Sequence, residues 1–278
     1  MTARSTLLPR VLAPVVGGST DCTHHTASKG STVSSTGRTY LDDVIALLTE
    51  VRDEQWSPIE QAAELVAGAI ATGGLVHVFG TGHSHLLAEE LFYRAGGLAP
   101  VNPILVDALM LHAGAARSTR LERLSGLGEA ILDGERVGPT DVLIVISNSG
   151  GNAACVEMAQ AAVARGIPTI ALTSLRHATA AAARSDPGPR LHDVADVVLD
   201  NRGRPGDACT DLDGLDVAVG PTSTAVGAAV LNAVVVEAVR LVLAQGGTPD
   251  VFASSNVEGG DRVNADLIAR YSPRVRSL

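Results

Sequence analysis

The stretch Asp141-Val-Leu-Ile-Val-Ile-Ser-Asn-Ser-Gly-Gly-Asn152 decides how this chain folds. Its first half is apolar at every position after the aspartate, which predicts a strand buried on both faces. Its second half, residues 147–152, consists of small polar residues and glycine, and it leads into apolar residues at helical spacing up to Arg165. A strand, a glycine-rich loop and a helix in this order are typical of an α/β protein with a parallel sheet.

The same alternation recurs on both sides of this stretch. Four more apolar runs predict strands, at residues 75–79, 100–106, 167–172 and 194–199. Two helices are predicted before the first strand, one from Tyr40 and one that opens at Ser57-Pro58 with Ser57 as its N-cap. A long Ala/Val-rich helix is predicted over residues 222–243. We therefore expect a three-layer αβα sandwich with a five-stranded parallel sheet, preceded by two helices.

Residues 1–37 differ in composition from the rest of the chain. They are rich in Ser, Thr, Gly and Pro and have no helical or strand period, so we expect a disordered leader outside the fold. Residues 38–278 are expected to form one domain. Within it, residues 109–136 make too long a connection between two strands and are expected to act as a lid.

Charge and residue counts argue against several classes of function. The 278 residues include 30 acidic and 21 basic ones, and the net charge of −9 disfavours a nucleic-acid partner. The only lysine is Lys29, in the leader, so a lysine-dependent phosphate loop and Schiff-base chemistry are not expected. The three cysteines show no CxxC spacing, and no long membrane-spanning run was apparent. These features predict a cytoplasmic protein with reduced thiols, no metal and no membrane partner.

Three loops of glycine and hydroxyl residues each open a predicted helix, at residues 80–84, 147–152 and 220–224. The free N–H groups and the positive dipole end of such a helix can hold a phosphate without a lysine. The first two loops follow strands, and ligands of open parallel sheets bind at the carboxyl ends of strands. Gly80-Thr-Gly82 also begins like a dinucleotide fingerprint, but His85 stands at its third glycine position. We therefore expect a phosphate ligand and no cofactor.

The Ser147–Asn152 loop, with Gly-Thr-Gly-His-Ser one strand earlier, resembles the SIS (sugar isomerase) phosphosugar-binding domain over residues 40–271. The segment HVFGTGHSHLLAEELFYRAGGLAPVNPI, from His77, is similar to a single-domain bacterial branch that includes N-acetylglucosamine 6-phosphate dehydratases. More distantly, the chain resembles phosphoheptose isomerase and N-acetylmuramic acid 6-phosphate etherase. The resemblance implies a flavodoxin-like sheet, a sugar 6-phosphate as ligand, and a homodimer in which the partner completes the site.

The resemblance also implies site residues. The phosphate is expected at Gly82, Ser84, Ser147, Asn148, Ser149 and Asn152, and the sugar at Thr222, Ser223 and Thr224. Asn152 stands where the family usually has threonine, so one hydroxyl donor is replaced by an amide.

Catalysis on an open-chain sugar needs a base beside C2, whose proton is acidified by the C1 carbonyl, and it needs no metal. The helix after the first loop offers Glu89, Glu90, His83 and His85. We expect Glu90, or else Glu89, to take the proton, and one of the histidines to open the ring or protonate the leaving 3-hydroxyl. The predicted reaction is dehydration of N-acetylglucosamine 6-phosphate across C2–C3. Aldose–ketose isomerisation and a phosphosugar sensor without turnover remain alternatives.

Overall fold

The computed structural model describes residues 36–182 and 188–278. Residues 1–35 of the predicted leader, with Lys29, lie outside the described residues, whereas its last two residues begin the first helix. Two helices come first, α1 (Thr36–Glu54) and α2 (Trp56–Ala71), as predicted. However, α2 begins one residue before Ser57, which accepts a hydrogen bond from the Gln61 side chain (3.2 Å) instead of capping the helix.

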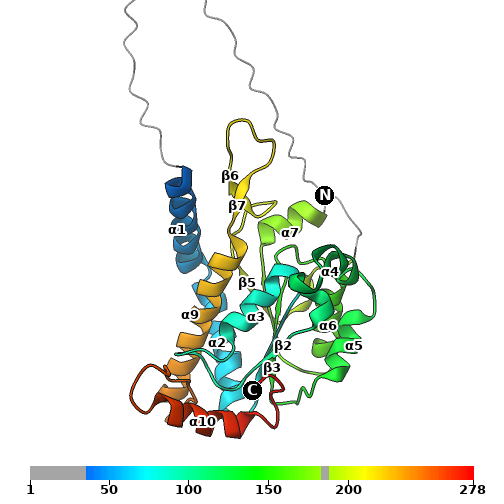
Figure 1. The fold of residues 1–278 in the computed structure, drawn as a ribbon. Helices are drawn as coiled ribbons and strands as arrows, with labels where there is room; N and C mark the ends of the chain where they lie inside the picture. The colour runs from blue at the N-terminus through cyan, green and yellow to red at the C-terminus, as the bar shows by residue number, and fades with distance from the viewer. Residues whose placement is uncertain (1–35, 183–187) are drawn as a thin grey trace, which may run out of the picture. The chain divides into compact units, whose positions relative to one another are not determined.

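The core of the fold is a five-stranded parallel sheet in the order β2-β1-β3-β4-β5 (Figure 1). Its strands are β1 (Val76–Gly80), β2 (Val101–Ile104), β3 (Val142–Ile146), β4 (Thr169–Thr173) and β5 (Val197–Asp200). All five predicted strands are confirmed, and the order is that of flavodoxin-like sheets.

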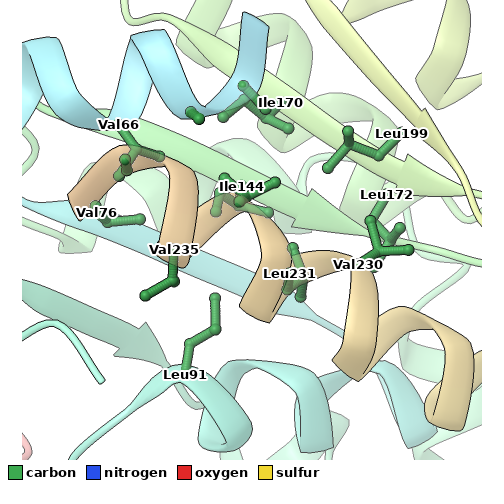
Figure 2. Packing of buried hydrophobic residues seen from close by; sticks show 14 of the residues in the cluster. Val66, Val76, Leu91, Ile144, Ile170, Leu172, Leu199, Val230, Leu231 and Val235 are labelled. Atoms are coloured by element: carbon green, nitrogen blue, oxygen red, sulfur yellow. The ribbon is translucent and has the colours of Figure 1, made fainter. Parts of the chain in front are cut away.

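Alternate residues of β3 face two separate hydrophobic clusters. Ile144 and its i±2 neighbours pack with α2, α3 (His85–Leu91) and α9 (Ser223–Ala244) on one face of the sheet (Figure 2). Leu143 and Val145 pack on the other face against α5 (Leu127–Gly134) and α6 (Ala153–Ala164). Both faces of the sheet are therefore covered by helices, which explains why β3 is apolar at every position.

Several elements were not predicted. The expected lid, residues 109–136, contains two helices, α4 (Ala115–Leu121) and α5. After β4 comes α7 (Leu175–Ala182), where the run of small residues from His177 predicts a helix, and then the short, unpredicted α8 (Leu191–Val194). An antiparallel hairpin of β6 (Ala208–Thr210) and β7 (Val219–Pro221) precedes α9, and α10 (Gly260–Tyr271) follows it. The short strands β6 and β7 have no clear hydrophobic alternation, which is why the sequence pattern gave no sign of them.

The helix α9 corrects one expectation from the sequence. By length and composition it is apolar enough to cross a membrane, although no such run was anticipated. One face of α9 is buried against the sheet and α2, with Val230 and Leu231 in the same hydrophobic cluster as Val66 (Figure 2).

Candidate functional site

Two of the predicted phosphate loops lie side by side at one edge of the sheet. The strands β1 and β3 are neighbours, but the chain continues from β1 to β2 on one side and from β3 to β4 on the other. The carboxyl ends of β1 and β3 therefore form the topological switch point, where open α/β sheets bind their ligands. Residues 81–84 and 147–152 follow these two strand ends.

The first loop folds tightly back on its strand. A 3-10 turn, Gly82–Ser84, leads directly into α3, and Gly82 has a positive φ of 55°. A Cβ at Gly80 would lie 2.7 Å from the main-chain carbonyl carbon of Ser84. Glycine at this position lets the loop approach the strand end, and Thr81 is buried beneath the loop.

The second loop offers a row of unused backbone donors. The amides of Ser149, Gly151, Asn152 and Ala153 have no acceptor among the residues that the structure describes. Asn152 is the N-cap residue of α6, but its side chain makes no capping hydrogen bond. Successive free N–H groups at a helix start form a concave donor set suited to a phosphate.

Asn148 is held in place by the adjacent strand β4. Its carbonyl oxygen accepts hydrogen bonds from Ser174 N (3.2 Å) and Thr173 Oγ1 (3.3 Å), and its Oδ1 accepts one from Asn201 Nδ2 (3.0 Å). These bonds fix the backbone between the two predicted phosphate serines, Ser147 and Ser149. The loop is thus rigid before any ligand binds.

A pocket of about 290 Å³ opens between the two loops. Its lining comprises Thr81, Gly82, His83, Ser84, Leu111, Thr119, Glu122, Ser147, Asn148, Ser149, Asn152 and His177. Seven of these residues were predicted to belong to the site: Gly82, His83, Ser84, Ser147, Asn148, Ser149 and Asn152. The structure thus brings both loops together around one polar pocket.

The sequence interpretation missed Glu122, the carboxylate of this pocket. Glu122 ends α4 in the expected lid, and its Oε2 accepts a hydrogen bond of 2.6 Å from Thr81 Oγ1. Its backbone oxygen accepts one from Ala154 N at the start of α6 (3.0 Å). The lid segment is therefore tied to both loops, and it carries the acid into the site.

Two imidazoles line the same pocket. His83 comes from the first loop, as predicted, and His177 comes from α7, where no role was predicted. The Nδ1 atom of His177 accepts a hydrogen bond from Gly206 N (2.8 Å), so a neutral ring carries its proton on Nε2. His177 can therefore donate that proton or a hydrogen bond from Nε2.

The predicted bases lie elsewhere. Glu90 pairs with Arg94 and accepts a hydrogen bond of 3.0 Å from Asn232 of α9, while Glu89 is exposed. His85 is only 5% exposed, and its Nδ1 has no hydrogen-bond partner in the described part of the chain. None of these three residues is among those that line the pocket.

The third predicted loop is occupied by a carboxylate of the chain itself. Asp207 accepts hydrogen bonds from Thr222 N (3.2 Å), Ser223 N (2.9 Å) and Ser223 Oγ (2.7 Å) at the start of α9. Thr224 and Ser223 line a small cavity of about 20 Å³ beside Ser84. Asp207 therefore fills the anion position that a phosphate was expected to take at this helix.

Cys155 lies behind the second loop without reaching the pocket. Its thiol is fully buried, and burial raises its pKa to about 12. It remains a protonated thiol at neutral pH, so it is no nucleophile. No group of three or more His, Cys, Asp or Glu side chains placed to hold a metal is found in residues 36–182 and 188–278.

Comparison with known proteins shows which families and structures this chain resembles. Residues 39–174 match the family model of the SIS domain. A UPF0309 protein from Geobacillus thermodenitrificans is 42% identical over 239 residues, which cover 86% of this chain and 96% of that protein. A UPF0309 protein from Brucella anthropi is 45% identical over 235 residues, covering 84% and 96%. Among solved structures, a phosphoheptose isomerase from Neisseria gonorrhoeae aligns with a TM-score of 0.44 and 20% identity, over 73% of this chain and 94% of that one.

Proposed function

The chain belongs to the UPF0309 protein family and contains a SIS domain, and on this premise we propose that it is a phosphosugar enzyme with Glu122 as its base. The observation that carries the proposal is the position of the Glu122 carboxylate, in the same pocket as the donors of both loops. A sugar phosphate held by those donors would present its carbon chain to this carboxylate.

The phosphate would bind at the second loop. The free amides of residues 149 and 151–153, with the hydroxyls of Ser147 and Ser149, supply donors in a chain segment without lysine. The dipole of α6 adds favourable charge at the same point. Ser84 would reach the ligand from the first loop.

The reaction would begin on the open-chain aldehyde. Glu122 removes the C2 proton, which the neighbouring C1 carbonyl acidifies, and an enolate forms across C1 and C2. In a dehydration, the C3–O bond then breaks as His177 or His83 gives a proton to the leaving hydroxyl. Water departs, and a C2–C3 double bond conjugated to the aldehyde remains. This makes the protein a lyase, with N-acetylglucosamine 6-phosphate as the proposed substrate.

Aldose–ketose isomerisation is the second candidate, because the same pocket supports it. It requires a sugar phosphate with a hydroxyl at C2. After the same proton abstraction, the resulting enediolate is protonated at C1, the O2 proton moves to O1, and the C3–O bond stays intact. His177 favours the dehydration, since its Nδ1 accepts the hydrogen bond from Gly206 N and a neutral ring keeps a proton on Nε2 that can be given to the leaving hydroxyl. In the dehydration the imidazole protonates the hydroxyl that leaves C3, whereas the isomerisation needs no proton at that oxygen.

One experiment separates these functions. The protein is incubated in D₂O with hexose, hexosamine and N-acetylhexosamine 6-phosphates, and the products are analysed by mass spectrometry and NMR. Loss of one water supports the lyase, whereas an aldose-to-ketose conversion without loss of water identifies an isomerase. Binding with neither turnover nor deuterium incorporation at C2 would contradict both and indicate a sensor.

We also propose that the enzyme works as a homodimer that shares its site. Apolar side chains are exposed on α1 and on two elements that each contact it: Ile45 of α1 (61%), Val217 of the β6–β7 hairpin (65%) and Val236 of α9 (66%). Burial of such a surface against a second copy would remove it from water. Light scattering tests this, and a monomer at micromolar concentration would contradict it.

A further inference from the structure

A second polar cavity lies at the opposite edge of the sheet, near the amino ends of the strands. It measures about 310 Å³ and is lined by Glu135, Arg136, Ser272, Pro273, Arg274 and Arg276. The segment 135–136 follows α5, and residues 272–276 follow α10. None of these residues lines the candidate sugar-phosphate pocket.

Three arginines line this cavity in a chain that carries a net charge of −9. Arg276 has no hydrogen-bond or ion-pair partner among the residues that the structure describes. Arg136 makes one long hydrogen bond there, 3.5 Å to the Pro273 carbonyl oxygen. These two side chains therefore have unused N–H donors beside one cavity, although like charges repel each other.

Carboxylates of the protein do not fully neutralise the three arginines of this cavity. The Glu135 carboxylate also lines the cavity, and its Oε2 accepts a hydrogen bond of 3.2 Å from Asn102 Nδ2. Asp141 Oδ1 accepts a hydrogen bond from Arg274 Nη2 (2.8 Å), and Arg274 Nη1 donates one to the Gly73 carbonyl oxygen (2.7 Å). Three arginines thus face two carboxylates, and the excess positive charge lies on Arg136 and Arg276.

We propose that this cavity is a second binding site, for a small oxyanion such as a phosphate group. Guanidinium forks pair with the oxygens of phosphates and carboxylates through two parallel hydrogen bonds, and the Ser272 hydroxyl adds a donor. Arg274 is held by Asp141 and Gly73, so it presents a fixed positive charge. Arg136 and Arg276 close on the anion from the two neighbouring segments.

The test uses inorganic phosphate as the probe and amide NMR of the full chain as the readout. Sodium chloride of equal ionic strength is the control for screening. We expect phosphate, and not chloride, to shift the resonances of residues 135–138 and 272–276. These shifts are followed separately from those of residues 147–153, because the sugar-phosphate pocket can also take phosphate.

Single substitutions make the test specific. Arg276→Ala and Arg136→Ala should each weaken binding at this cavity about tenfold, the loss expected for one charge-assisted contact, while leaving shifts at residues 147–153 unchanged. Both arginines are exposed, so the fold should survive. Arg240→Ala, on an exposed arginine of α9, is the matched control and should bind as the parent does. Unshifted resonances at 135–138 and 272–276, or equal affinity in Arg276→Ala and Arg240→Ala, would overturn the proposal.

Discussion

The carboxylate of Glu122 is anchored by one oxygen and open at the other. Thr81 Oγ1 donates to Oε2 at 2.6 Å, whereas Oε1 has no hydrogen-bond partner in the described part of the chain. A proton acceptor in a pocket needs this arrangement, because one bond fixes its orientation and the free oxygen can approach the substrate. Glu90 also has one engaged oxygen, because Arg94 and Asn232 both bind its Oε1, but Glu90 does not line the pocket.

At the residue scale, Glu122→Gln should therefore abolish proton abstraction while leaving the fold intact. The glutamine has the same size, and its amide oxygen can still accept the Thr81 hydrogen bond. We expect turnover and C2–deuterium exchange to fall by roughly 10²–10⁴-fold, the usual contribution of a general base. Steady-state kinetics and NMR exchange measure this. Glu90→Gln serves as the control, and a larger loss in that variant than in Glu122→Gln would refute the assignment.

At the scale of elements, the helices α5 and α6 touch through a glycine. A Cβ at Gly128 of α5 would lie 2.2 Å from Ala154 O and 2.7 Å from Met158 N of α6. The backbone of Gly128 is therefore in close contact with α6, and this contact holds the expected lid against the second loop. Any side chain larger than hydrogen must push the two helices apart.

The expected result of Gly128→Ala is a loss of about 1–3 kcal/mol in the free energy of unfolding, typical of overpacking. Gly134→Ala is a matched control in the same helix, because no atom lies within 4 Å of its added Cβ. That variant should be neutral or stabilising by up to about 1 kcal/mol through helix propensity. Urea denaturation of both variants measures the difference, and equal stabilities would show that the helices can separate at no cost.

The start of α9 gives a second test at this scale. The Asp207 carboxylate accepts the backbone N–H groups of Thr222 and Ser223, so it neutralises the positive end of a 22-residue helix. Asp207→Asn keeps one acceptor oxygen and tolerates the positive φ of 69°, but it removes the charge. We expect a loss of about 1 kcal/mol in the free energy of unfolding. Asp211→Asn, at an exposed position of the hairpin, should leave that free energy unchanged, and a similar loss there would contradict the capping role.

At the scale of the whole molecule, local patterns in the sequence predicted the sheet and the two loops. Each strand and each glycine loop is a run of a few residues, and parallel pairing places their ends together. The pocket carboxylate Glu122 could not be found in this way, because Thr81 and Glu122 are 41 residues apart. His177 likewise reaches the pocket from a distant part of the sequence, the helix α7 that follows β4. Glu89 and Glu90 follow the first loop closely in sequence, but neither is among the residues that line the pocket.

A buried polar network joins the amino ends of the strands. Each oxygen of Asp141 accepts two hydrogen bonds: Oδ1 from Leu75 N and Arg274, and Oδ2 from Gly138 N and His77 Nε2. His77 and Asp141 are each 1% exposed. These bonds link the entry of β1 to that of β3 and to the end of the chain. The central strands therefore depend on one charged side chain.

This network predicts how stability responds to acid. Burial raises the pKa of Asp141, but hydrogen bonds from His77, Gly138 N and Leu75 N outweigh that effect and hold the pKa at about 2. Because the folded pKa lies below the unfolded value of about 3.9, the carboxylate contributes stability that is fully present above about pH 4. About 2 kcal/mol of it should be lost as the pH falls from about 4 towards 2.

Asp141→Asn should remove this response. Any orientation of the new amide sets its NH₂ group against two donors, so we expect a loss of about 3–5 kcal/mol at neutral pH. The variant should then lose less stability than the parent between about pH 4 and pH 2, because the titrating group is gone. Denaturant unfolding at a series of pH values measures both effects, with Asp216→Asn, at an exposed position, as the control. Parallel pH curves for the parent and Asp141→Asn would mean that the acid sensitivity of the fold arises at other carboxylates.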